Sequence, residues 1–535
     1  MTTSMLLFFQ MILRVILTVI LLCIATCHSL EKGDGFQVFR VLPTTNQQLL
    51  QMIRLFETAD TDRADFWHAP SVVNGTVDIM VAPEHTGQFQ KYLEKHGYTY
   101  QIAIQDLRTL LIEKEGNIST HSTDDAFFMK RLHDDVGFHS RLRMGEYYSY
   151  SVLSTWLQRI AENMPDIAKL IKVGTTIEGR EILGLKFGKD TPDKKVVVID
   201  AGIHAREWAA IHTASYFINL VIFDQSSLLE NKINFQIVNS REGDPQIQNY
   251  LDNIVLYIIP VLNPDGYEYT RTDKTNPRAR MWRKSRSPKA CAFDGVRNSC
   301  CMGVDLNRNF DFRFSEIGAS RYPCSEIYHG PSAFSEPESK AYSQFLASLK
   351  GRLEAYITLH SYSQLWIYSY SHRKFTYAPD IDETRRVAAK AVQELGRMYG
   401  TKYRHGTGPE IIYAFSGGST DWAKETLKIK YSYTIELRPG YEEWNGFVLD
   451  KNQLIPTAKE TWAGVTVVLD EVTNQWKSSK NRESELSRIR QEKCSDRLSG
   501  CAYWLQSSPN ICRISQSTMI RDCAKTCDLC HMIAV

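Results

Sequence analysis

Four apolar runs, each followed by polar or turn-forming residues, dominate the hydrophobic pattern of the chain. The first run, Lys195 to Gly202, reads Lys-Val-Val-Val-Ile-Asp-Ala-Gly, and further runs cover residues 253–262, 354–359 and 430–437. Apolar residues at consecutive rather than alternate positions are typical of strands buried on both faces. Helical stretches separate the runs, so the pattern predicts an α/β fold with a mixed, mostly parallel, twisted sheet flanked by helices.

Residues capable of binding a metal follow three of these predicted strands. His204 and Glu207 come after the first strand, His360 after the third, and Glu436 lies near the end of the fourth, whereas the second stops at the predicted turn 263–266. Open α/β sheets bind ligands outside the carboxyl ends of their strands, so we expect these side chains to converge. An isolated His-x-x-Glu is usually a solvated surface pair, but three matching strand ends argue against that interpretation here.

Two imidazoles and one carboxylate are a common ligand set for catalytic zinc, which keeps a fourth position open for water. We therefore predict one Zn²⁺ bound by His204, Glu207 and His360. Glu436 is then left as the general base. Its neighbours on the run, such as Ile435, indicate a buried strand, where a carboxylate without a role would be costly.

Six motifs resemble those of zinc metallocarboxypeptidases of the pancreatic carboxypeptidase A/B type in their zymogen form. The matching segments run from about Phe36 to Trp476. The motifs are Gly202-Ile203-His204-Ala205-Arg206-Glu207-Trp208, Met281-Trp282-Arg283-Lys284, Val304-Asp305-Leu306-Asn307-Arg308-Asn309, His360-Ser361-Tyr362-Ser363-Gln364, Ser416-Gly417-Gly418-Ser419 and Ile435-Glu436-Leu437-Arg438. The resemblance implies the zinc carboxypeptidase fold and an enzyme that removes the C-terminal residue of peptides and proteins.

The resemblance also implies roles around the metal. Arg283 matches the arginine that polarises the scissile carbonyl and stabilises the oxyanion, although the basic run 278–286 taken alone would be a solvated face. Asp305 matches the carboxylate that supports the first histidine ligand and fixes its tautomer. Without the family, Asp305 could be a helix or turn cap.

Recognition of a free α-carboxylate suits a planar guanidinium, which binds such a group through two hydrogen bonds. By resemblance, Arg308 and Asn307 bind this carboxylate with help from Tyr413, while Arg206 and Tyr362 contact neighbouring substrate residues. Read without the family, Asn307 and Arg308 could equally be an ordinary polar turn.

The residue that determines side-chain preference in the family follows Ser-Gly-Gly-Ser, and here it is Thr420. An acidic residue there would favour basic C-termini, and an arginine would favour acidic ones. We expect Gly408, Phe415 and Ser371 to complete a neutral wall. The hypothesis is a preference for aliphatic or aromatic C-terminal residues.

Composition sets the class of protein. A chain of 535 residues has room for several domains, and a formal net charge of +2 argues against nucleic-acid and membrane partners. The apolar stretch Val15 to Cys23 is short for a membrane span and suits the core of a signal peptide. We predict cleavage after Cys27 or Ser29 and a secreted, extracellular protein. An uncleaved signal anchor is the alternative.

The chain divides into six predicted segments. The second, which resembles the family's activation propeptide, is a small α+β unit with strands at 37–41, 76–81 and 100–104 and helices at 46–59 and 85–96. The third carries Lys130-Arg131 and Arg141-Leu142-Arg143, natural points for an activating endoprotease, although a merely solvated linker is the alternative. The segments are a signal peptide (1–27), propeptide (35–115), linker with the activation cleavage (116–145), catalytic domain (146–476), flexible linker or exposed helix (477–493) and disulfide-rich module (494–530).

Cysteine usage supports an oxidising compartment. Of 12 cysteines, Cys23 and Cys27 lie in the signal segment, which leaves an even number in two clusters. The family resemblance implies a Cys301–Cys324 disulfide, so Cys291 and Cys300 would form an additional local bridge. Zinc thiolate sites are the alternative.

Residues 494–530 are too few to bury a sufficient core without cross-links. Their pattern, with Asp496, Trp504, Met519 and Thr526, resembles a ShKT (sea-anemone-toxin-like) domain. That resemblance implies the pairs Cys494–Cys530, Cys501–Cys523 and Cys512–Cys527, whereas spacing alone leaves many pairings open. Toxin members carry Lys-Tyr where this chain has Ile520 and Arg521, so we expect binding to an unknown extracellular ligand rather than channel blocking.

Two further expectations complete the analysis. Asn74 and Asn117 begin glycosylation sequons. A catalytically inactive secreted binding or matrix protein that acts through its ShKT domain is the alternative function. A channel-modulating toxin on a scaffold is a third. The intact set of metal-binding and catalytic residues favours the enzyme.

Overall fold

The computed structural model describes residues 35–60, 63–116, 142–233, 245–293, 298–492 and 494–533. For residues 223–233 and at 487 and 492 it describes the backbone alone. The predicted signal peptide, the second sequon at Asn117, and the basic residues Lys130, Arg131 and Arg141 lie outside the described residues. No helix in the described ranges is both long and apolar enough to cross a membrane. By its internal contacts, the chain divides into one unit ending at Val468 and a second that begins at Leu469.

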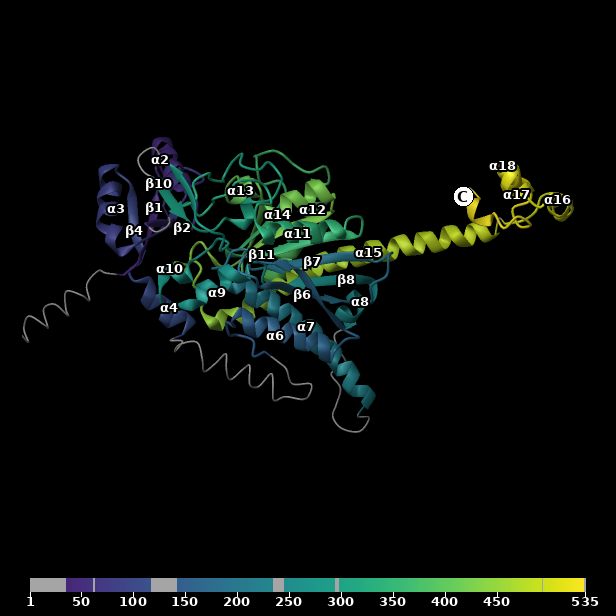
Figure 1. The fold of residues 1–535 in the computed structure, drawn as a ribbon, viewed down its shortest axis with the longest axis horizontal. Helices are drawn as coiled ribbons and strands as arrows, with labels where there is room; N and C mark the ends of the chain where they lie inside the picture. The colour runs from purple at the N-terminus through teal and green to yellow at the C-terminus, as the bar shows by residue number, and fades with distance from the viewer. Residues whose placement is uncertain are drawn as a thin grey trace, which may run out of the picture. The chain divides into compact units, whose positions relative to one another are not determined.

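The predicted propeptide forms an antiparallel sheet in the order β2-β3-β1-β4, covered by helices (Figure 1). Its elements are β1 (Gln37–Leu42), α2 (Asn46–Thr58), β2 (Ala64–Phe66), β3 (Val77–Val81), α3 (Pro83–Lys95), β4 (Thr99–Ile104) and α4 (Leu107–Glu115). Thr45 caps α2 by accepting a hydrogen bond from the Gln48 amide, and Asp106 caps α4 in the same way. The predicted strands and helices are confirmed, whereas β2 and α4 were not predicted.

A large mixed sheet forms the centre of the catalytic domain, in the order β13-β12-β14-β11-β7-β8-β6-β5. The four central strands β14, β11, β7 and β8 run parallel, while β5, β6 and the β12–β14 pair are antiparallel. The strands are β5 (Ala168–Thr175), β6 (Glu181–Phe187), β7 (Lys195–Ala201), β8 (Ile254–Ile259), β11 (Leu353–Ser363), β12 (Leu365–Tyr368), β13 (Arg404–Thr407) and β14 (Tyr431–Gly440). The predicted fold class is confirmed.

Helices cover the sheet, with α7 against β7 and β11, α11 against β5, and α12 against β12 and β13 (Figure 1). The helices are α6 (Tyr150–Asn163), α7 (Trp208–Ile233), α8 (Pro245–Asn253), α9 (Pro264–Thr272), α10 (Pro277–Arg280), α11 (Pro337–Ser348), α12 (Ile381–Tyr399), α13 (Gly408–Ile411), α14 (Ser419–Trp422) and α15 (Leu454–Glu492). Shorter turns of helix are η1 (Leu306–Arg308), η2 (Ala423–Leu427) and η3 (Lys451–Gln453).

Two local predictions need correction. The segment after the second apolar run is the start of α9 rather than a turn, because Asn263 caps the helix through the Gly266 amide and Pro264 occupies its first position. The third and fourth strands continue past the predicted ends, so His360 lies within β11 and not after it. For residues 477–493 we predicted either a flexible linker or an exposed helix. The structure shows a helix up to Glu492, as part of α15.

The disulfide pairing matches the prediction throughout the described residues. Cys291–Cys300 closes the hairpin of β9 (Ala290–Phe293) and β10 (Asn298–Cys301), and Cys301–Cys324 joins that hairpin to a loop. These bonds leave the cysteines unavailable as zinc thiolates.

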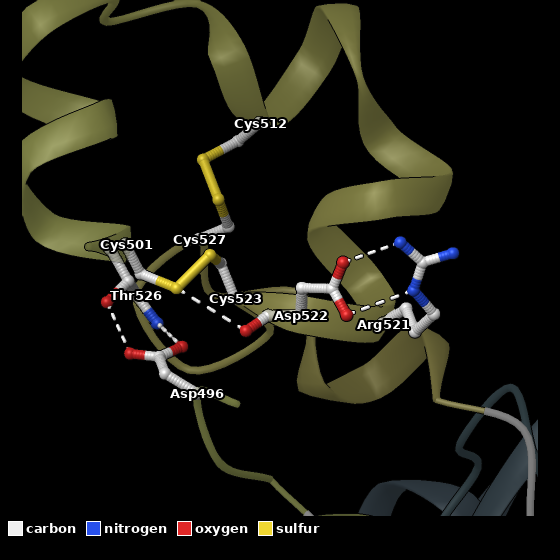
Figure 2. Close-up of a disulfide and its surroundings, with 8 residues drawn as sticks. All are labelled: Asp496, Cys501, Cys512, Arg521, Asp522, Cys523, Thr526 and Cys527. Carbon is white, nitrogen blue, oxygen red and sulfur yellow. Dashed lines mark hydrogen bonds and ion pairs between the residues drawn. A yellow bond between two sulfur atoms is a disulfide. The ribbon is translucent and has the colours of Figure 1, made fainter. Parts of the chain in front are cut away.

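The disulfide-rich module contains α16 (Cys501–Ser507), α17 (Ile511–Ile514), α18 (Gln516–Asp522) and η4 (Cys530–Met532). Its bonds are Cys494–Cys530, Cys501–Cys523 and Cys512–Cys527, as predicted. Figure 2 shows the second and third bonds, beside the carboxylate of Asp496 that accepts hydrogen bonds from the backbone and hydroxyl of Thr526. The core of the module is small and contains Cys501, Met519 and Cys523, so covalent bonds replace apolar burial as its main constraint.

Candidate functional site

Three buried metal-ligand side chains meet at the carboxyl ends of β7 and β11. His204 and Glu207 lie on the turn between β7 and α7, and His360 lies on β11. The Nδ1 atom of His204 is 2.7 Å from Oε1 of Glu207, and Nδ1 of His360 is 2.9 Å from Oε2 of the same carboxylate. The two Nδ1 atoms are 3.1 Å apart. Within the described residues, the ligand atoms of this trio all lie within 4.8 Å of one another, so one metal ion can contact all of them.

The turn that brings them together needs Gly202. Its φ of +66° is a conformation that other residues rarely adopt, and a Cβ atom there would lie 2.8 Å from the Ile211 side chain. The glycine that ends the first predicted strand therefore positions the two ligands that follow it.

Asp305 orients the first histidine. Its Oδ1 lies 3.2 Å from Nε2 of His204, and its Oδ2 accepts hydrogen bonds from Nε and Nη2 of Arg283 at 3.1 and 2.9 Å. Burial alone would raise the pKa of Asp305, but the charges of Arg283, Arg308 and His204 hold it well below its usual value. An ionised Asp305 accepts the Nε2 proton, which leaves the Nδ1 lone pair of His204 directed at the other ligands.

Glu436 lies on β14, in register with His360 on the neighbouring strand. Its side chain is half-buried and lines the same cavity as the metal-ligand trio. Burial, together with the negative charge of Glu207, raises the pKa of Glu436 to about 8. A titratable carboxyl group therefore lies on the cavity wall next to the metal-ligand trio.

Arg308 and its neighbours form a second polar cluster on the cavity wall. The guanidinium of Arg308 donates to the carbonyl of Gly318 at 2.7 Å and to the hydroxyl of Tyr413 at 3.2 Å. The Asn307 amide oxygen accepts the Ser419 backbone N–H at 2.9 Å, which fixes this side chain. Arg308, Asn307 and Tyr413 all line the cavity.

Thr420, the residue predicted to determine side-chain preference, lies behind the cavity wall rather than on it. Thr420 is buried, and its hydroxyl is 3.3 Å from that of Thr434, which lines the cavity while Thr420 itself does not. Gly408 packs against Ser371 and Phe415, since a Cβ atom on the glycine would lie 3.0 and 3.2 Å from them. Of these predicted wall residues, only Phe415 reaches the cavity in this closed form.

The remaining predicted substrate contacts are occupied by the propeptide. Nη1 of Arg206 lies 2.7 Å from Oδ2 of Asp65 on β2, and the hydroxyl of Tyr362 is 3.4 Å from Oδ2 of Asp78 on β3. Trp67 and His68 line the cavity beside the metal-ligand trio. The propeptide therefore occupies part of the cleft beside the metal-ligand trio.

Sequence reasoning did not find a second propeptide ion pair. Glu115, at the end of α4, accepts two hydrogen bonds from the guanidinium of Arg280, at 2.8 and 2.6 Å, and both side chains are buried. Arg280 also donates to the Arg206 carbonyl and stacks on Trp208. The basic run around Arg280 was visible in the sequence, but nothing in it indicated a partner from the propeptide.

Comparisons with known proteins agree with this geometry. The zinc carboxypeptidase family profile matches residues 153–464, and the carboxypeptidase activation peptide profile matches residues 39–115. Carboxypeptidase A2 of Mus musculus is 35% identical over 447 residues, which cover 83% of this chain and 95% of the relative. Carboxypeptidase B of Bos taurus is 35% identical over 450 residues, which cover 82% and 94%. The crystal structure of thrombin activatable fibrinolysis inhibitor aligns with a TM-score of 0.66 at 28% identity, covering 82% of this chain and 99% of that one.

Proposed function

Because the chain belongs to the zinc carboxypeptidase family and is a zinc-dependent metallocarboxypeptidase made as a zymogen, we propose that His204, Glu207 and His360 bind its zinc ion. The donor set fits the ion, since two imidazoles and a carboxylate converge in a buried site and leave a side open toward the cavity. Asp305 supports the first imidazole through its second nitrogen. When bound, zinc supplies Lewis-acid activation of water and of the scissile carbonyl.

Glu436 is the proposed general base. It faces the cavity from the strand next to His360, and it takes the proton of the attacking water and passes it to the leaving amine. Its position on the cavity wall suits both halves of this transfer, since the same carboxylate can reach the attacking water and the leaving amine.

Arg283 stabilises the negative charge that develops on the carbonyl oxygen. Its Nη1 is 3.9 Å from Oε1 of Glu207, and its other nitrogens are fixed by Asp305. This ion pair orients the guanidinium before substrate arrives, which is the condition for effective transition-state stabilisation.

Arg308 and Asn307 bind the α-carboxylate of the substrate, and Tyr413 closes over it. Arg308 has its Nε and Nη1 occupied by backbone carbonyls, so its orientation does not depend on substrate. A fixed guanidinium restricts the reaction to the end of a chain, because an internal peptide bond carries no carboxylate at this position.

We expect aliphatic or aromatic C-terminal residues to be preferred. Thr420 and Thr434 supply hydroxyls but no charge, and Phe415 adds an apolar surface. The relatives include carboxypeptidases named A and B, so the family alone does not decide the preference. Turnover by the activated enzyme of peptides that differ only in a terminal Phe, Leu, Lys or Glu tests it, and fastest turnover of the Lys peptide would refute it.

Activation requires removal of the propeptide, and the packing of the residues that follow Arg141 supports a proposal for where the chain is cut. Leu142 is 3% exposed, the Arg143 carbonyl accepts the Tyr148 hydroxyl proton at 2.8 Å, and the Gly145 amide donates to His212 at 2.9 Å. A protease needs an extended, accessible segment, so the packed stretch from Leu142 onward favours cleavage upstream of it. The activating endoprotease would then cut after Lys130 or Arg131, because a cut after Arg141 would require Leu142 to leave its packed position.

Secretion, glycosylation and the ShKT identity belong to the same proposal. The disulfides and the exposed Asn74 support an extracellular protein, and the pairing in the module supports a ShKT domain with an extracellular ligand. Peptide mapping of the secreted protein with and without glycosidase would test the carbohydrate at Asn74.

The convergence of the buried metal-ligand trio beside Glu436 is the observation that carries the proposed mechanism. The test is native mass spectrometry of the trypsin-activated protein, combined with peptide hydrolysis. One zinc per chain and activity that chelation abolishes are expected for the wild type. A Glu436→Gln variant should keep the metal and lose activity, and retained activity in this variant would refute the general-base assignment.

A further inference from the structure

A buried charge cluster joins the propeptide to the catalytic domain. It consists of Asp65 on β2, Arg206 beside the metal-ligand turn, and Glu326 in the loop that Cys324 anchors. Nη1 of Arg206 is 2.7 Å from Oδ2 of Asp65 and 3.6 Å from Oε2 of Glu326. Their exposed fractions are 3%, 1% and 8%, so water screens none of these charges effectively.

The cluster contains two carboxylates but only one guanidinium, that of Arg206, between them. Both carboxylates approach the same nitrogen of Arg206, and the shorter contact belongs to Asp65. Oε2 of Glu326 and Oδ1 of Asp65 have no hydrogen-bond partner among the described residues. A buried, ionised carboxylate with an unbonded oxygen is unfavourable, and Asp65 has the shorter contact with Arg206, so Glu326 is the group whose protonation relieves the conflict in the closed zymogen.

The other charges that act on Glu326 do not remove this conflict. Lys284 and Arg283 are positive and favour its ionised form, as does Arg206. Lys284 donates to the Pro323 carbonyl, and Arg283 is held by Asp305. Burial and the charge of Asp65 outweigh them and raise the pKa of Glu326 to about 7.

We propose that Glu326 is a proton-dependent switch for propeptide retention, which holds the propeptide tightly while protonated and loosens it when ionised. This inference rests on the zymogen architecture and does not depend on the proposed substrate preference. It predicts that the severed propeptide stays bound in acidic surroundings and leaves at neutral pH.

The direction follows from comparing the two states. When the propeptide leaves, Asp65 goes with it and Glu326 keeps Arg206, so its pKa falls toward the ordinary value of about 4.3. Between about 4.3 and 7, release therefore expels a proton, and the dissociation constant of the propeptide rises by up to roughly tenfold per pH unit. Above the pKa of the closed state, both states are ionised and the dependence on pH ends.

His68, a half-buried titratable group of the propeptide beside the cleft, acts in the opposite direction. Burial lowers its pKa, so release lets it gain a proton and acidification favours release. A propeptide that binds more tightly at acidic pH cannot owe that behaviour to His68.

The experiment uses the full-length, zinc-loaded chain, cut in the linker by limited trypsin treatment that is then stopped with an inhibitor. Retention of the propeptide fragment is measured between pH 5 and 8.5 by native mass spectrometry and size-exclusion chromatography over a dilution series. We expect the wild-type dissociation constant to rise with pH below about 7 and to level off above it. Glu326→Gln should bind tightly with no rise over that range.

Two further variants make the test specific. Glu338→Gln is the matched control, because Glu338 is also buried with its pKa raised to about 7, but it contacts the Ile177 amide away from the propeptide. This control should keep the wild-type pH dependence. Asp65→Asn removes the competing carboxylate, so it should bind more weakly at acidic pH and show a shallower rise, and it serves if the Glu326 variant does not fold.

Each possible outcome either supports or overturns the proposed role of Glu326. A wild-type dissociation constant that does not change with pH would overturn the proposal. So would a rise that persists in Glu326→Gln, which would assign it to another cleft carboxyl such as Glu436, or a rise lost equally in Glu338→Gln. Loss of the rise in Glu326→Gln alone, with the control unchanged, supports the switch.

Discussion

Two charged clusters around the cleft differ in what neutralises them. At the metal end, His204, Glu207 and Asp305 contact one another and Arg283, all within the catalytic domain. In the second cluster, Arg206 and Arg280 obtain their shortest carboxylate contacts from the propeptide. We infer that the metal-ligand cluster is already assembled in the zymogen and that the propeptide acts by covering the cavity.

Removal of the metal should have the largest effect on activity. Chelation should abolish peptide hydrolysis by the activated enzyme, because zinc supplies the activation that no protein group replaces. Zinc added back should restore the activity. The uncut zymogen should bind zinc with the same stoichiometry in native mass spectrometry. A zymogen that binds zinc only after cleavage would contradict the claim that its metal end is complete.

Loss of the general base tests the metal end without removing the ion. Glu436→Gln should lower kcat by about 10³–10⁴-fold, at the upper end for general acid–base catalysis, with little change in KM. Glu338→Gln provides a matched control, since it removes another buried carboxyl away from the cavity and should keep kcat near the wild-type value.

Arg283→Gln should have the next largest effect. Removing one preorganised donor to the oxyanion typically costs about 10²–10³-fold in kcat. Because Arg283 also pairs with Asp305, the variant should bind zinc more weakly too, which a competition titration with a chelator can measure. An unchanged kcat would place the oxyanion elsewhere in the cavity.

The contact between the propeptide and Arg280 is tested in the uncut zymogen. Glu115→Gln leaves Arg280 buried without a charged partner, which costs about 3 kcal/mol of the closed form. The open fraction should then rise roughly 10²-fold, and so should the activity of the uncut protein on a small peptide.

The control for this variant lies on the same helix. Glu113→Gln removes a carboxylate whose side chain is 62% exposed and pairs with Lys114, so the zymogen should remain as inactive as the wild type. Activity of the fully activated enzyme provides the reference for both variants. Equal effects of the two substitutions would show that α4 does not hold the propeptide through Arg280.

The smallest effect is expected at the pocket wall. Thr420→Asp places a charge behind Thr434, so turnover of peptides ending in Lys should rise about tenfold relative to those ending in Phe, equivalent to about 1.4 kcal/mol. Unchanged relative kcat/KM values would show that Thr420 is too far from the substrate side chain to determine preference.

The metal end could be predicted from sequence because each of its residues follows or ends a recognisable apolar strand. His204 and His360 are far apart in the chain, yet parallel strands bring their ends to one edge of the sheet. The extension of β11 past Leu359 was missed, because Ser361 and Tyr362 do not continue the apolar run that defines a buried strand.

The propeptide contacts could not be predicted in the same way. Glu115 and Arg280 are 165 residues apart, and Asp65 and Arg206 are 141 residues apart, with no shared sheet to align them. A carboxylate on a short helix such as α4 looks like an ordinary solvated charge until the docking of two domains buries it. Glu326 was missed for the same reason, because only the packed interface reveals that it competes with Asp65.

The Cys301–Cys324 bond has a consequence for the reversibility of activation. It fastens the loop that carries both Ser320, which donates to the Glu57 carbonyl of the propeptide at 2.6 Å, and Glu326. Because this disulfide lies within the catalytic domain, we expect the surface to keep its shape after the propeptide dissociates. The released propeptide can therefore rebind the same surface as a competitive inhibitor. Full activation then requires that the released propeptide be diluted or degraded.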